Sequence, residues 1–170
     1  FGCLVGSEMC IRDRNYYLSL MVVDSLLQDI KYADLTNIKI QEAKGRFEIV
    51  NDSPIKIIDG AHNYEGVEIL LRNYENKYGN LNTDIFLGFK KGKDINNILN
   101  LIIGKTNYNL HLIEDDTFFD QEITKEIGYL LDKHGKNYKI ASLEQFKKNK
   151  NPSILLGSLY LIGEYKKRKL

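Results

Sequence analysis

The residues best suited to chemistry are concentrated in residues 59–63, which read DGAHN. They lie between an apolar run at residues 55–58 and a segment with helical spacing, which is where α/β proteins place reactive groups. Gly60 and Ala61 allow a tight turn, and free N–H groups at a helix start favour anionic ligands. A carboxylate at Asp59 suits a ribose hydroxyl or a metal-bound water. The alternative is that Asp59 and His62 only cap and brace the turn.

Two further positions have suitable side chains. Arg46 lies in the segment GRFE at residues 45–48, just before a strand-like run, and its guanidinium could pair with phosphate oxygens. Ser158 follows Gly157 where another strand-like run becomes a helix. Each has a structural alternative, a solvated arginine in the first case and an ordinary strand-to-helix turn in the second.

The rest of the chain lacks the common nucleotide and metal motifs. Residues 104–106 (GKT) imitate the end of a P-loop, but Leu99 stands where the first glycine is required. His111 and His134 have no ligands at zinc spacing, so no metal site is predicted. Cys3 and Cys10 are the only cysteines, which favours a reducing compartment.

Composition indicates one globular domain or slightly more. The 170 residues are 43% apolar, and 24 Lys and Arg nearly balance 23 Asp and Glu, giving a net charge of +1. With a mean hydropathy of -0.34, the chain falls in the soluble class. The charge balance argues against a nucleic-acid partner, and no apolar run approaches the roughly 20 residues that a membrane span needs.

Strand-like and helix-like segments alternate from residue 47 onward. Residues 47–50 and 55–58 form a predicted hairpin, and later strands are predicted at 85–87, 110–113, 138–140 and 153–156. Helices are predicted at 63–78, 94–103, 120–133 and 142–148, and from 158 onward. This alternation predicts an α/β fold whose mainly parallel sheet is flanked by helices, with the hairpin as an antiparallel edge.

The N-terminal region differs in character. Residues 1–14 match nothing downstream and are interpreted as a non-native leader, with a native strand or loop as the alternative. Residues 15–28 are apolar on nearly every side, as expected of a helix packed on more than one face within a larger body.

Four segments together resemble a known family. They are GRFE at 45–48, IIDGAHN at 57–63, Gly88 with Lys93-Asp94, and GSLYLIGE at 157–164. In this order they resemble the C-terminal part of folylpolyglutamate synthase, including the bifunctional dihydrofolate synthases, within the Mur ligase superfamily. The resemblance implies a Rossmann-like Mur ligase C-terminal domain at residues 35–170. Residues 15–34 would then be a remnant of the last helix of the central ATPase domain.

The resemblance also implies an activity. Such enzymes use ATP and Mg²⁺ to phosphorylate the γ-carboxylate of a folate, and the amine of an incoming glutamate then displaces phosphate. Four residues resemble, by position, residues of the family's ATP site: Asn15, Arg46, Asp59 and His62. Ser158 resembles, by position, a residue on the glutamate side of the site. A cytoplasmic monomer is expected, with folate and glutamate as substrates.

Departures from the family pattern limit this expectation. The P-loop, the magnesium ligands and most of the folate pocket are absent from these 170 residues, so the chain alone is predicted to be inert. Tyr64 and Lys44 stand where prolines are common, but neither is a proposed contact. Two alternatives stay open: another Mur-type amino-acid ligase, or an α/β binding module without chemistry.

Overall fold

The computed structural model describes residues 18–19, 21–23, 25–26, 44–114 and 121–168. The chain divides into two compact units, residues 1–43 and residues 44–170. In the first unit the described residues are helical, as predicted within residues 15–28, and Leu18, Met21 and Leu26 are exposed. Asn15 and the proposed leader lie outside the described residues. The assignment of this segment to a central domain therefore stays a prediction.

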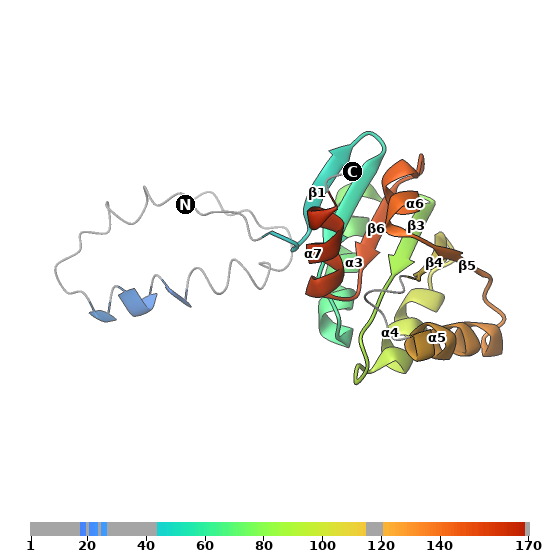
Figure 1. Ribbon diagram of the computed structural model, residues 1–170. Coiled ribbons are helices and arrows are strands. Elements are labelled where there is room, and N and C mark those ends of the chain that lie inside the picture. The colour runs from blue at the N-terminus through green and yellow to red at the C-terminus, as the bar shows by residue number, and fades with distance from the viewer. Residues whose placement is uncertain (1–17, 20, 24, 27–43, 115–120, 169–170) are drawn as a thin grey trace. The chain divides into compact units, whose positions relative to one another are not determined.

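The second unit is built on one six-stranded sheet with the order β1-β2-β6-β3-β4-β5 (Figure 1). The strands are β1 (Glu48–Asp52), β2 (Ile55–Asp59), β3 (Thr83–Leu87), β4 (Tyr108–Ile113), β5 (Tyr138–Ala141) and β6 (Ser153–Leu156). Strand β1 pairs antiparallel with β2, and every other pairing is parallel. The predicted α/β class, with its antiparallel edge hairpin, is confirmed.

Helices cover both faces of this sheet (Figure 1). They are α3 (Tyr64–Tyr78), α4 (Ile95–Ile103), α5 (Gln121–Lys133), α6 (Leu143–Lys148) and α7 (Leu159–Lys167). Side-chain caps begin four of them: Asn63 before α3, Asp94 before α4, Ser142 before α6 and Ser158 before α7. Each cap accepts a hydrogen bond from a backbone N–H that the first helical turn leaves unpaired.

Each face of the sheet has its own apolar core. One core joins α3, α4 and α5 to the sheet and contains Val67, Leu70, Leu71 and Tyr74 of α3, with Tyr78 packed against it. The other joins α6 and α7 through residues such as Phe146 and Leu161. Full burial of one such side chain stabilises the fold by about 1.5–3 kcal/mol, so both helical layers are anchored by packing.

The placement of β6 decides where the chain can hold a ligand. Strand β6 lies between β2 and β3, and its register sets Leu156 beside both Asp59 and Leu87. The helices that follow β2 and β3 cover one face of the sheet, whereas α7, which follows β6, covers the other. The loop after β6 therefore leaves the sheet toward the face opposite to the loops after β2 and β3. Open α/β sheets bind ligands at the carboxyl ends of strands where neighbouring connections diverge in this way.

Candidate functional site

Asp59 ends β2 with its carboxylate almost fully buried. Its Oδ2 accepts a hydrogen bond from the Phe47 N–H at 2.7 Å, and its Oδ1 accepts one from the Ala61 N–H at 2.7 Å. Burial raises the pKa of Asp59 above its usual value, while the two N–H groups and Arg46 act to lower it. Asp59 thus braces the turn, as the structural alternative expects. A carboxylate has about four lone-pair positions, so a further donor can still be accepted.

Arg46 lies beside this carboxylate. Its Nη1 is 3.9 Å from Asp59 Oδ1, and its side chain is 46% exposed. The chain turns sharply around it, because Gly45 has a φ of 73° and Phe47 a φ of 45°. The left-handed conformation is unusual for phenylalanine and is held here by the Asp59 bond to the Phe47 N–H. The guanidinium is therefore accessible on a constrained backbone, an arrangement suited to phosphate oxygens.

The turn after β2 packs closely against α7. A Cβ on Gly60 would lie 2.3 Å from Leu159 Cδ2, so only glycine fits without a shift of Leu159. The Gly60 N–H also donates to the Gly45 carbonyl at 2.8 Å, which joins the two loops directly. His62 Nδ1 lies 2.8 Å from the Gly60 carbonyl oxygen, so this ring is fixed by the turn. The structure brings Arg46, Asp59 and His62 together on neighbouring loops.

Ser158 lies at the same edge of the sheet, after β6. It is buried, and its Oγ accepts a hydrogen bond from the Tyr160 N–H at 3.2 Å as the cap of α7. The preceding Gly157 has a φ of 125° and approaches the backbone of Gly88, which follows β3. Next to this point Lys90 Nζ lies 3.5 Å from the centre of the Tyr160 ring. The described geometry accounts for Ser158 as a cap; its role toward glutamate stays a prediction.

Sequence reasoning missed the side chains that hold residues 45–47, the segment that carries Arg46 and is called the arginine loop below. Glu48 Oε2 accepts hydrogen bonds from the Gly45 N–H and from Lys166 Nζ, both at 2.5 Å. Burial raises the pKa of Glu48, but the Lys166 and Gly45 bonds outweigh it and the pKa lies below the usual value. The sequence signal was present only in part, since Glu48 is two residues from Arg46 but Lys166 is far along the chain.

A second polar group lies at the opposite, amino end of the sheet. Asp84 in β3 is buried and accepts hydrogen bonds from the side-chain amides of Asn109, Asn149 and Asn151 at 2.8–3.1 Å. These bonds fasten the loop between α6 and β6 to the sheet. Burial raises the pKa of Asp84, but the amides and His111 outweigh it and the pKa lies below the usual value. No sequence motif indicated this cluster.

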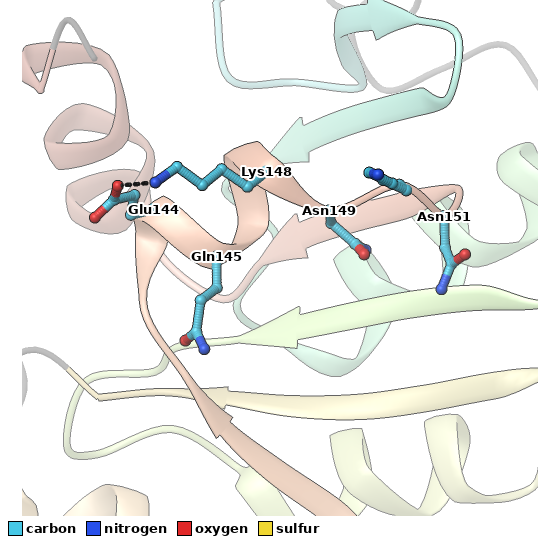
Figure 2. A pocket seen from close by; sticks show the side chains of 6 residues that line it. Glu144, Gln145, Lys148, Asn149 and Asn151 are labelled. Carbon is cyan, nitrogen blue, oxygen red and sulfur yellow. Dashed lines mark hydrogen bonds and ion pairs between the residues drawn. The ribbon is translucent and has the colours of Figure 1, made fainter.

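An open pocket of about 480 Å³ adjoins that loop (Figure 2). It is lined by Glu144, Gln145, Lys148, Asn149, Lys150 and Asn151. Lys148 pairs with Glu144 across one helical turn, and most of the lining side chains are exposed. None of the predicted site residues lines this pocket. Its solvated walls give it no buried polar group to fix a ligand's orientation.

The described residues contain no group of three or more His, Cys, Asp or Glu that could hold a metal ion. The Mg²⁺ that the resemblance implies has no such cluster of ligands within these residues. Within the same residues, no helix is long and apolar enough to cross a membrane.

Comparison with known proteins identifies the relatives. No protein-family model matches the chain. Over 130 residues it is 27% identical to the dihydrofolate synthase/folylpolyglutamate synthase of Bacillus subtilis (strain 168), covering 73% of this chain and 30% of that protein. The chain resembles folylpolyglutamate synthases. The match confirms the resemblance first drawn from the motifs.

Solved structures agree with this likeness in fold. The folylpolyglutamate synthase of Thermotoga maritima matches with a TM-score of 0.72 and 20% identity, over 95% of this chain and 39% of that chain. The Mycobacterium tuberculosis folylpolyglutamate synthase complexed with ADP matches with a TM-score of 0.74 and 16% identity, over 92% and 39%. UDP-N-acetylmuramate-alanine ligase MurC of Thermotoga maritima matches with a TM-score of 0.63 and 15% identity, over 95% and 38%. The chain thus has a fold shared by folylpolyglutamate synthases and a Mur ligase, and spans less than half the length of these relatives.

Proposed function

We propose that this chain is the nucleotide-facing C-terminal domain of an ATP-dependent ligase that adds glutamate to the γ-carboxylate of a folate. The observation that carries the proposal is the meeting of Arg46 and Asp59 at the carboxyl end of β2. This is where an open α/β sheet binds ligands, and the likeness to folylpolyglutamate synthases supports an amino-acid ligase domain.

In the proposed reaction a carboxylate oxygen of folate takes the terminal phosphoryl group of ATP, which leaves ADP and an acyl phosphate. The amine of glutamate then attacks the acyl carbon, phosphate departs, and the new amide carries the longer tail. Arg46 would neutralise phosphate charge, and Asp59 would hold the arginine loop and accept a ribose hydroxyl. His62 would line the nucleotide side, and Ser158 the glutamate side. Asn15 is a further proposed nucleotide contact.

This chain would supply only part of the site. The described residues offer no metal cluster, and no P-loop occurs in the sequence, so Mg²⁺ and the triphosphate would be held mainly by a separate central domain. We therefore expect no ligase turnover from the 170 residues alone. The proposal includes a cytoplasmic location, a monomeric state and folate and glutamate as substrates.

The first test is a titration of the ¹⁵N-labelled 170-residue chain with ADP, followed by NMR. We expect weak binding, in the millimolar range, with shifts confined to Asn15 and to residues 45–47 and 59–62. Arg46→Gln should abolish the shifts because it removes the guanidinium. The charge-matched control, Lys133→Gln on the exposed end of α5, should leave them unchanged. Shifts located instead at the pocket of residues 144–151, or no shifts at all, would contradict the proposal.

A different Mur-type ligase is the second candidate, favoured by the match to MurC. Side-by-side turnover of folate and of peptidoglycan precursors by a longer enzyme containing this chain would separate the two. Turnover of neither, together with a silent ADP titration, would favour a binding module without chemistry.

A further inference from the structure

Helix α7 runs along the arginine loop, and the residues that make these contacts share one helical face. Leu159 lies against Gly60, and a Cβ on Gly45 would lie 3.0 Å from Ile162 Cγ2. Lys166 bonds to Glu48 at the far end of the same helix. The three contacts fall at positions i, i+3 and i+7, which lie on one side of a helix. The loop that carries Arg46 is thus supported over most of the helix's length.

The polar end of this support acts on the backbone next to Arg46. Glu48 Oε2 receives the Lys166 ammonium and the Gly45 N–H, so one carboxylate oxygen links α7 to the residue that precedes Arg46. The residue that follows Arg46 is held separately, through the Phe47 N–H and Asp59. The residues on both sides of Arg46, Gly45 and Phe47, therefore have their N–H groups held by different carboxylates.

We propose that Glu48 and Lys166 are positioning residues for Arg46, holding its backbone through the Gly45 N–H so that the guanidinium faces the nucleotide. The inference rests on the proposed function for what Arg46 binds. The positioning itself depends only on contacts between described residues. Both side chains are about 30% exposed or less toward solvent: 27% for Glu48 and 31% for Lys166. Lys166 is therefore better shielded than Lys167 on the same helix, which pairs with Glu164 and is 74% exposed.

The test measures amide hydrogen exchange by NMR in the 170-residue chain. Lys166→Met should speed exchange at Gly45 about tenfold, because Glu48 loses the charge that orients it. Exchange at Ala61, whose N–H is held by Asp59, should stay within twofold of wild type. Lys166→Arg should restore slow exchange at Gly45, and the matched control Lys167→Met should not change it. General destabilisation of the fold would instead speed hydrogen exchange at Gly45 and Ala61 together.

A second variant, at Glu48, tests the same contact from its other partner. Glu48→Ala should speed Gly45 exchange at least as much as Lys166→Met, and the double variant should add little to either, since both act through one contact. Unchanged Gly45 exchange in Lys166→Met, equal acceleration at Ala61, or an equal effect from Lys167→Met would overturn the inference.

An ADP titration of the same variants separates this inference from the proposed function. If ADP shifts the NMR signal of Arg46 in the wild-type chain, Lys166→Met should weaken the ADP affinity severalfold and Lys166→Arg should restore it. An ADP affinity that is not weakened in Lys166→Met would overturn the inference. If wild type does not respond to ADP, the proposed function fails, and the exchange data alone decide whether Glu48 and Lys166 hold the loop.

Discussion

At the scale of single residues, Asp59 has a buried carboxylate whose two oxygens join separate turns. One oxygen holds the Phe47 N–H before β1, and the other holds the Ala61 N–H after β2. Burial raises the pKa of Asp59, and Arg46 at 3.9 Å offsets only part of this effect. The same residue can therefore shape the loop and still offer an acceptor to a ligand.

Ser153 gives the first residue-scale prediction. Its Oγ is buried and has no hydrogen-bond partner among the described residues. Because an unpaired buried hydroxyl is costly, Ser153→Ala should raise the free energy of unfolding by about 1 kcal/mol. Urea denaturation measures this change in the free energy of unfolding. The control Ser142→Ala removes the capping box of α6 and should lower the same quantity by about 1 kcal/mol. A loss of stability in Ser153→Ala would show that the hydroxyl has a partner.

Asp84 gives a prediction about pH. Its folded-state pKa lies below the ordinary value of 3.8, so the ionised carboxylate stabilises the fold. This contribution is complete above the unfolded-state pKa and is lost as the pH falls through the lower, folded-state pKa. Asp84→Asn should therefore be less stable than wild type at about pH 5, with the difference narrowing at about pH 3. Urea denaturation of both proteins at the two pH values measures this difference in stability. A constant difference would mean that charge is not what the amides recognise.

At the scale of elements, the backbones of Gly88 and Gly157, which follow β3 and β6, lie in close contact. A Cβ on Gly157 would lie 2.5 Å from the Gly88 carbonyl oxygen, and the φ of 125° also disfavours any other residue. This contact sets where α7 begins. It therefore sets where Leu159 and Lys166 meet the arginine loop.

Gly157→Ala should lower the free energy of unfolding by more than about 2 kcal/mol, because backbone strain and overlap add. Gly163 is the matched control. It lies inside α7 with nothing within 4 Å of an added Cβ, so Gly163→Ala should raise stability by about 0.5–1 kcal/mol. Thermal unfolding of both variants provides the measurement. Similar behaviour of the two would contradict the assigned contact.

At the scale of the whole molecule, the elements were readable from sequence because each has a local pattern of apolar residues, either periodic or in a short continuous run. The α4 segment repeats apolar residues at helical spacing, and β6 is a short apolar run ended by Gly157. The predicted hairpin of residues 47–50 and 55–58 also accounts for the proximity of Arg46, which precedes its first strand, to Asp59, which ends its second. These are local patterns, and a single sequence displays them directly.

Long-range partners were not readable in this way. Lys166 is 118 residues from Glu48, and Asn149 is 65 residues from Asp84. Such pairs depend on strand order, and nothing local specifies that β6 inserts between β2 and β3. Polar side chains also resemble solvated ones until their burial is known. The arginine was therefore predicted and its supports were not.

The central place of β6 has a consequence for biosynthesis. It pairs with β2 on one side and β3 on the other, although it is the last of the six described strands in chain order. Until residues 153–156 have left the ribosome, a two-stranded ribbon and a three-stranded ribbon remain unjoined, each with an open edge. A premature stop codon just upstream of this segment would therefore split the sheet down its middle rather than trim it.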